Sequence, residues 1–139
     1  MRVNHLIIGV ANLNESREFF VGVLGFKSIG EFVDTGTGGT GLVLVHCDSR
    51  DQETLEILLV PFAAARLPSP QHLALEVSAE LFETVFSTAK KNGLPIRAVP
   101  PLDSKETGII GRFECRGVVY ERFYLLDPSR VNIEIMYRR

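Results

Sequence analysis

Short apolar, strand-like runs and two helix-like segments alternate along the chain, and the pattern occurs twice. Residues 4–10 read Asn-His-Leu-Ile-Ile-Gly-Val, and residues 71–77 read Gln-His-Leu-Ala-Leu-Glu-Val. In both runs a polar amide precedes a histidine and a strand-like stretch follows. A helix-like segment and then further strand-like segments come after each run. Because internal similarity of this kind is typical of a duplicated unit, we predict an α+β fold of two βαβββ modules.

Each predicted helix has a start and a stop signal. Asn12 followed by Glu15 starts the first helix and Gly25 ends it, whereas Ser78 starts the second and Gly93 ends it. The apolar residues at near-helical spacing are Leu13, Phe20 and Leu24 in the first helix, and Phe82, Val85, Phe86 and Ala89 in the second.

The remaining apolar runs give the other strands. We predict strands near 26–35, 41–47 and 54–60 in the first half, and near 95–100, 109–114 with 118–126, and 131–137 in the second. Residues 1–139 form one domain in this interpretation, with modules 1–61 and 70–139 joined by the proline-containing segment 61–70. Extra residues near 102–118 lengthen the second module as a loop or hairpin.

The alternation of side chains along a strand separates the polar residues from the apolar ones. His5 and His72 lie opposite the apolar residues that suit packing against a helix. Glu56, within Leu-Glu-Ile, and Glu134, within Ile-Glu-Ile, are likewise opposite their apolar neighbours. We therefore expect all four side chains on the open faces of the sheets.

Two imidazoles and two carboxylates suit a divalent metal such as Zn, Ni, Co, Mn or Fe. Four protein ligands in a six-coordinate site leave two positions for water or substrate oxygens, where the metal acts as a Lewis acid. A single strand histidine is more often a hydrogen-bonded structural residue, and a single strand glutamate is more often solvated. Their joint recurrence, and the cost of burying a carboxylate without a partner, favour one metal ion held by His5, Glu56, His72 and Glu134.

At these positions the chain resembles the vicinal oxygen chelate superfamily. This superfamily contains glyoxalase I, fosfomycin-resistance proteins, methylmalonyl-CoA epimerase, extradiol dioxygenases and bleomycin-resistance proteins. The fragments that carry the resemblance are Asn4-His5-Leu6, Phe19-Phe20, Leu24-Gly25-Phe26, Leu55-Glu56-Ile57, Gln71-His72-Leu73, Leu126-Asp127-Pro128 and Ile133-Glu134. The resemblance implies mixed sheets shaped as half-barrels, with the helices on their outer faces.

The resemblance also implies a function. Bacterial glyoxalase I has the ligand set His, Glu, His, Glu, which matches His5, Glu56, His72 and Glu134. We therefore predict a metal-dependent lyase or isomerase that stabilises an enediolate, with Glu134 as the base or, alternatively, Glu56. The family further implies a homodimer in which His5 and Glu56 of one chain meet His72 and Glu134 of the other.

Two positions depart from glyoxalase I, which commonly has an arginine and an asparagine four residues beyond its first two ligands to hold glutathione. Here these positions are Gly9 and Val60. Arg122 and Arg112 are candidates to compensate, but the sequence does not fix where they point. A dioxygenase of the same superfamily and a non-catalytic protein that sequesters an antibiotic or a metabolite therefore stay as alternatives.

Composition excludes other classes of function. The net charge is −2, with no basic patch for nucleic acid, and no apolar run is long enough for a membrane span. We expect no targeting segment at residues 1–15, and the widely spaced Cys47 and Cys115 lead us to expect free thiols and a cytoplasmic protein. The Gly-Thr-Gly-Gly-Thr-Gly run at 36–41 precedes a strand rather than a helix, so it does not predict a nucleotide site. His46 is interpreted as a surface residue.

Overall fold

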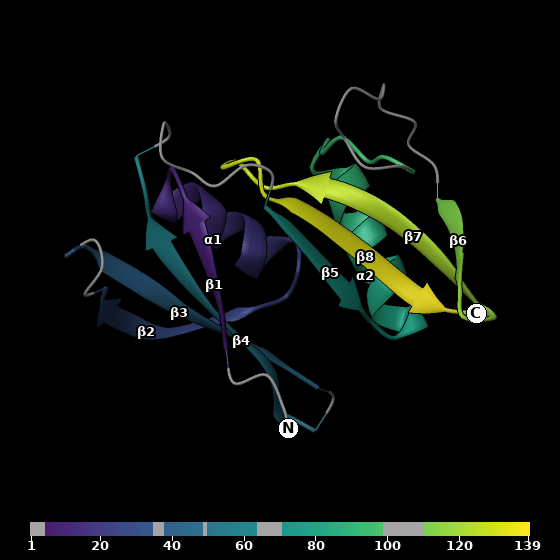
Figure 1. Cartoon of the computed structure of the whole chain (residues 1–139), viewed down its shortest axis with the longest axis horizontal. Helices are drawn as coiled ribbons and strands as arrows, with labels where there is room; N and C mark the ends of the chain where they lie inside the picture. The colour runs from purple at the N-terminus through teal and green to yellow at the C-terminus, as the bar shows by residue number, and fades with distance from the viewer. Residues whose placement is uncertain (1–4, 35–37, 49, 64–70, 99–109) are drawn as a thin grey trace. The chain divides into compact units, whose positions relative to one another are not determined.

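The computed structural model describes residues 5–34, 38–48, 50–63, 71–98 and 110–139, and the chain divides into two compact units, residues 1–69 and 70–139. The described residues of each unit form one four-stranded sheet and one helix (Figure 1). The first unit contains β1 (Leu6–Val10), α1 (Leu13–Gly22), β2 (Lys27–Val33), β3 (Thr40–Cys47) and β4 (Glu53–Pro61). The second contains β5 (His72–Glu76), α2 (Ala79–Lys91), β6 (Gly111–Cys115), β7 (Val118–Leu126) and β8 (Asn132–Arg138).

The two sheets share one topology. Their strand orders are β1-β4-β3-β2 and β5-β8-β7-β6. In each sheet the first strand runs parallel to the last, and the other neighbours are antiparallel. Both sheets are therefore mixed and open, which confirms the predicted α+β fold of two βαβββ modules.

The predicted helix signals are confirmed. The Asn12 side chain accepts a hydrogen bond from the Glu15 backbone N–H at 3.2 Å, and the Ser78 hydroxyl accepts one from the Leu81 N–H at 3.2 Å. These bonds satisfy amide groups that a helix start leaves without partners. Gly25 and Gly93 follow the helix ends with φ of +76° and +66°, a conformation that glycine adopts without strain.

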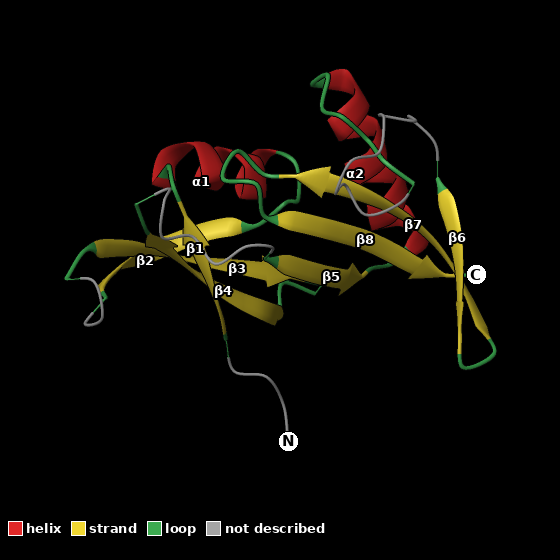
Figure 2. Ribbon diagram, turned by 45° about the horizontal axis from the view of Figure 1, so that its top comes forward, coloured by secondary structure: helices red, strands yellow, loops and turns green. Residues whose placement is uncertain are grey.

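Each helix covers one face of its own sheet, and the apolar core of the unit lies beneath it (Figure 2). In the first unit Phe20 is fully buried and packs edge-to-face against Phe26. In the second, Phe82 packs edge-to-face against Phe123 and Tyr137. Burial alternates along β5, where His72, Ala74 and Glu76 are exposed, as the predicted strand parity requires.

One predicted strand is wrong. In the expected strand 95–100, Arg97 forms an isolated bridge with Tyr124, and residues 99–109 lie outside the described residues. The expected segment at 109–126 is a hairpin of two strands, β6 and β7, joined at Arg116 and Gly117, both with positive φ. Part of the expected insertion near 102–118 is thus β6 itself, because this hairpin supplies the edge strand of the second sheet.

Residues 38–41 of the glycine-rich run lead into β3, as predicted, and residues 36 and 37 lie outside the described residues. A Cβ atom at Gly41 would lie 2.6 Å from the Leu59 carbonyl oxygen, so this glycine permits close packing within the sheet. Cys47 and Cys115 are free thiols. No helix in the described part of the chain is long and apolar enough to span a membrane.

Candidate functional site

A buried carboxylate, Glu134, lies at the centre of a polar network on the open face of the second sheet. The Glu134 side chain is 6% exposed, and its Oε2 atom lies 3.1 Å from Nε2 of His72. Its Oε1 atom accepts hydrogen bonds from the Tyr124 hydroxyl at 2.8 Å and from Nη1 of Arg122 at 3.0 Å. Both carboxylate oxygens therefore have polar partners, as a buried charge requires.

The local sequence explains this arrangement. At the turn between β7 and β8, the Asp127 carboxylate accepts a hydrogen bond from the Val131 N–H at 2.7 Å, which helps to fix the register of the two strands. Glu134 then lies directly opposite Tyr124 on β7, and it lies opposite Ala74 on β5. Because side chains two residues apart share a face, Arg122 and His72 join Tyr124 and Ala74 there.

Tyr124 and Arg122 are held firmly. Burial and the hydrogen bond to Glu134 raise the pKa of Tyr124 to about 12, so its hydroxyl stays protonated and donates at neutral pH. The Arg122 guanidinium lies over the Phe113 ring, 4.5 Å from the ring centroid, and 5.4 Å from the centroid of Tyr124. These contacts fix the guanidinium beside Glu134.

The other two predicted ligands, His5 and Glu56, belong to the first unit. Leu6 lies opposite Ile57 in the parallel pair of β1 and β4, so the residues just before them, His5 and Glu56, come side by side. His5 is exposed and Glu56 is half-buried. The strand pairing thus brings together one histidine and one glutamate in this unit as well.

The two units differ in register. If His5 is matched to His72, then Glu56 corresponds to Asn132, which lies opposite His72, and Glu134 corresponds to Leu58. The similar triplets around Glu56 and Glu134 are therefore offset by two residues. The offset preserves the face on which each glutamate lies, because side chains alternate with a period of two. The expectation that Glu56 and Glu134 occupy matched positions is correct for the sheet face on which they lie. It is wrong for their register relative to the histidines.

The separation of the two donor atoms in the second unit suits a metal. Ligand atoms about 2.1 Å from a metal ion and at right angles to each other are about 3.0 Å apart. Nε2 of His72 and Oε2 of Glu134 are 3.1 Å apart. No group of three or more His, Cys, Asp or Glu side chains that suits a metal occurs within the described residues. The four-ligand site as a whole stays a prediction.

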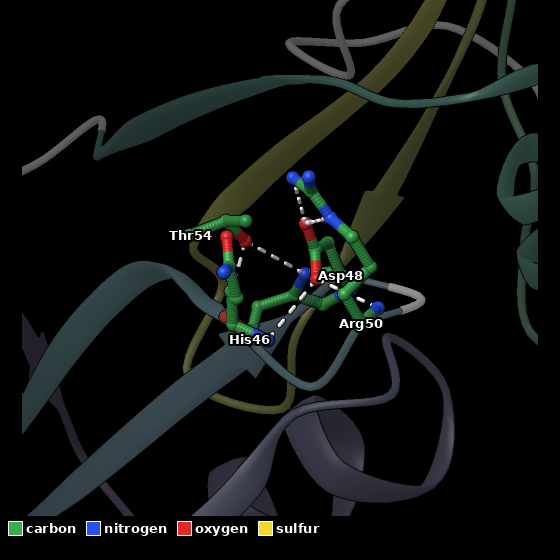
Figure 3. Close-up of polar contacts among 5 residues, drawn as sticks. His46, Asp48, Arg50 and Thr54 are labelled. Atoms are coloured by element: carbon green, nitrogen blue, oxygen red, sulfur yellow. Dashed lines mark hydrogen bonds and ion pairs between the residues drawn. The ribbon is translucent and has the colours of Figure 1, made fainter.

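His46 takes no part in this arrangement. It lies opposite Leu55 on β4, so its side chain is on the face opposite that of Glu56. Its ring packs edge-to-face on Phe26, and its Nδ1 atom lies 3.2 Å from the Thr54 hydroxyl (Figure 3). Burial lowers the pKa of His46. The histidine is a half-buried structural residue of the β3–β4 hairpin.

Two residues of this face are absent from the sequence-based prediction. Tyr124 is one of them, although the two-residue period along β7 places it on the face of Arg122. Arg97 was missed because only its backbone pairing with Tyr124 places it beside the sheet. Of the two arginines expected as candidates to compensate for Gly9 and Val60, Arg122 forms an ion pair with Glu134. Arg112 lies on the other face, where its Nη2 atom is 3.9 Å from Oε1 of Glu121.

A family model that covers nearly the whole chain identifies the family. The chain belongs to the Glyoxalase/Bleomycin resistance protein/Dioxygenase superfamily, whose model matches residues 2–135. Among solved structures, oxidase ChaP-H2 is 24% identical, with a TM-score of 0.68 over 100% of this chain and 94% of that one. Oxidase ChaP-H1 is 23% identical, with a TM-score of 0.67 over 100% and 97%.

A glyoxalase family protein from Enterococcus faecalis is 21% identical, with a TM-score of 0.63 over 97% of this chain and 96% of that one. No curated protein sequence matches the chain. These likenesses show the fold, and the family match confirms the resemblance seen in the sequence. The superfamily includes enzymes, and its members typically bind a metal and small molecules and often form dimers.

Proposed function

We propose that the chain is a divalent-metal-dependent enzyme for a small molecule, with chemistry like that of a glyoxalase I-type lyase or isomerase. His5, Glu56, His72 and Glu134 hold one ion of Zn, Ni, Co, Mn or Fe. The observation that carries the proposal is the 3.1 Å distance between Nε2 of His72 and Oε2 of Glu134. The other carboxylate oxygen, Oε1, is held by a hydrogen bond from Tyr124.

Each residue of the network has a role in this proposal. Arg122 and Tyr124 occupy Oε1 of Glu134, so Oε2 lies toward His72 and would be the oxygen that holds the ion. Partners behind a metal ligand set its orientation and contribute to affinity. The bound metal would supply Lewis-acid stabilisation of an enediolate. The base that moves the substrate proton is Glu134 or, alternatively, Glu56.

The ion is shared between two chains in the assembly that we propose. His5 and Glu56 come from one protomer, and the partner's His72 and the partner's Glu134 complete the ligand set. A closed twofold pair is the most common oligomer and gives two such sites for each dimer.

A second candidate is an oxygen-dependent reaction at the same residues. Two histidines and one carboxylate with open positions also suit an Fe(II) oxygenase, and two of the structures with this fold are described as oxidases. Oxygen consumption by the iron-loaded protein with candidate substrates separates this reaction from the isomerase. A protein that binds ligands without a metal of its own is a third possibility, and metal analysis tests it.

The proposal is tested by metal content. Purified protein is analysed for bound metals, stripped with a chelator and titrated with each of the five ions. We expect about one ion per chain and loss of binding in His72→Ala and Glu134→Gln. Glu114→Gln is the control, because Glu114 is an exposed carboxylate on β6, an edge strand of the same sheet that does not pair with β5 or β8. If both site variants bind metal as tightly as the Glu114→Gln control, His72 and Glu134 are not metal ligands and the proposed function is wrong.

A further inference from the structure

Arg97 lies outside the strands but beside the network of Glu134. Its N–H donates to the Tyr124 carbonyl at 3.1 Å, and its carbonyl accepts from the Tyr124 N–H at 2.8 Å. Residues that exchange both backbone hydrogen bonds in an antiparallel pair direct their side chains to the same face. The Arg97 side chain is therefore on the face of Tyr124, Glu134 and Arg122.

A glycine allows this segment to lie close to the sheet. A Cβ atom at Gly111 would be 2.6 Å from the Ala98 carbonyl oxygen, so a larger residue would displace the backbone next to Arg97. Gly111 is itself opposite Arg122 in the β6–β7 pair. The backbone of Arg97 is thus held by β7, and Gly111 leaves room for the adjacent Ala98.

The two arginines of this face have donors without acceptors. In the described part of the chain, Nε and Nη1 of Arg97 and Nε of Arg122 are buried and make no hydrogen bond. Buried donors without partners are uncommon in folded proteins because they lose their contacts with water and gain nothing in return. A guanidinium cannot resolve this by losing its proton. These donors therefore lack an acceptor that a ligand can supply.

The formal charges point to an anion. In the metal-free chain, Arg97 and Arg122 contribute two positive charges and Glu134 contributes one negative charge, so these three residues together carry one positive charge. Among the described residues of this sheet, Glu76 is the other carboxylate on this face, and it is exposed on β5. A carboxylate carries the single negative charge that balances the excess, and guanidinium groups match its planar geometry.

We propose that Arg97 and Arg122 bind a carboxylate group of the substrate, next to His72 and Glu134. The substrate class is then a small carboxylic acid. This inference deepens the function proposed above and depends on it in treating the bound acid as the substrate. The carboxylate accepts hydrogen bonds from the donors that now lack acceptors, which makes Arg97 a residue that determines specificity.

Benzoate and its neutral isostere benzamide test the proposal with metal-free protein. Binding of each probe is measured by ligand-observed NMR titration. We expect benzoate to bind at least about tenfold more tightly than benzamide, because a charged hydrogen-bonding partner is lost in the amide. Arg97→Met is expected to weaken benzoate binding by about tenfold or more. Arg112→Met, which removes an arginine from the opposite face, is expected to leave it unchanged.

Equal affinity for benzoate and benzamide, or unchanged benzoate binding in Arg97→Met, would overturn the proposal. If Arg97→Met does not fold, Arg97→Lys replaces it. An ammonium group is shorter and has no planar fork, so its benzoate binding is expected to fall several-fold, and full retention again overturns the proposal.

Metal titration separates this inference from the proposed function. Arg97→Met is expected to bind metal like the unmodified protein while losing benzoate. A protein that discriminates benzoate from benzamide through Arg97 but binds no metal would retain the carboxylate site and refute the metal-dependent function.

Discussion

Gly9 and Val60 lie directly opposite each other in the parallel pair of β1 and β4. They follow His5 and Glu56 by four residues each, so strand parity places them on the same face as these predicted ligands. Both are buried, and neither has a polar side chain. This part of the face cannot supply the arginine and asparagine side chains with which glyoxalase I commonly holds glutathione.

The first prediction follows from this pair. We expect poor or absent turnover of the methylglyoxal–glutathione adduct by the metal-loaded protein. Each lost hydrogen bond to a charged group costs about 1.5–3 kcal/mol, so two such losses reduce kcat/KM by a few hundred-fold or more. A steady-state assay with each of the five metals checks this. A kcat/KM on the order of 10⁵ M⁻¹s⁻¹ or above would show that Gly9 and Val60 matter less than we infer.

The second prediction concerns the support of Glu134. Tyr124→Phe removes the 2.8 Å hydrogen bond to Oε1 and leaves His72 and Glu134 in place. We expect metal affinity to fall by about 10–100-fold, as is typical for partners behind metal ligands. Competition with a fluorescent chelator measures the affinity. Tyr120→Phe is the matched control, because Tyr120 lies on the same strand and packs near Phe113. Equal affinities in the two variants would remove Tyr124 from the site.

The third prediction concerns alkaline pH. The pKa of Tyr124 is raised from 10.0 to about 12 in the folded chain, chiefly by burial and by the hydrogen bond to Glu134. A raised pKa stabilises the fold below the unfolded value, and this contribution is lost as pH rises from about 10 to 12, because the unfolded chain ionises first. We expect the unmodified protein to lose more stability than Tyr124→Phe over this range.

Urea unfolding at a series of pH values measures this difference, and tyrosinate absorbance follows the ionisation. Tyr137 also has a raised pKa, because its hydroxyl donates to Glu121, but it is present in both proteins and cancels in the comparison. Parallel loss of stability in the two proteins would mean that Tyr124 ionises as it does in an unfolded chain.

The fourth prediction tests the shared site. His5→Ala and His72→Ala are each expected to lack metal-dependent activity. When the two proteins are mixed and exchange subunits, random pairing restores about a quarter of the sites, because half of the dimers are mixed and each mixed dimer has one intact site. Activity after mixing is the measurement, and subunit exchange is verified by mass spectrometry. Stable monomers, or proven exchange without recovery, would contradict the sharing of ligands between chains.

The repeated sequence pattern was sufficient to predict both modules, because each part of it has a local physical cause. The Asn12 and Ser78 caps, the glycines that follow the helices and the alternation along β5 are determined by neighbouring residues. Alternation also placed Glu134 on the correct face.

The features that could not be predicted from the sequence depend on pairing between distant segments of the chain. Arg97 reaches the network through a single bridge to Tyr124, and no local periodicity marks that contact. The hydrogen bonds of Glu134 require the register of β7 and β8, which the turn at Asp127 helps to set. The expected strand at 95–100 was wrong for a related reason: the hairpin of β6 and β7 provides the edge strand instead.

The two-residue offset between the units means that the halves of this chain are not interchangeable parts. Glu56 is level with its histidine, whereas Glu134 lies two residues further along its strand, about 6.6 Å at the usual rise of a parallel strand. A tandem of two second units would keep the strand order but place both carboxylates in the advanced position. The shared strand order of the two units is therefore not sufficient to decide which halves can be exchanged. A chimera also takes the histidine–glutamate spacing of the unit that it receives.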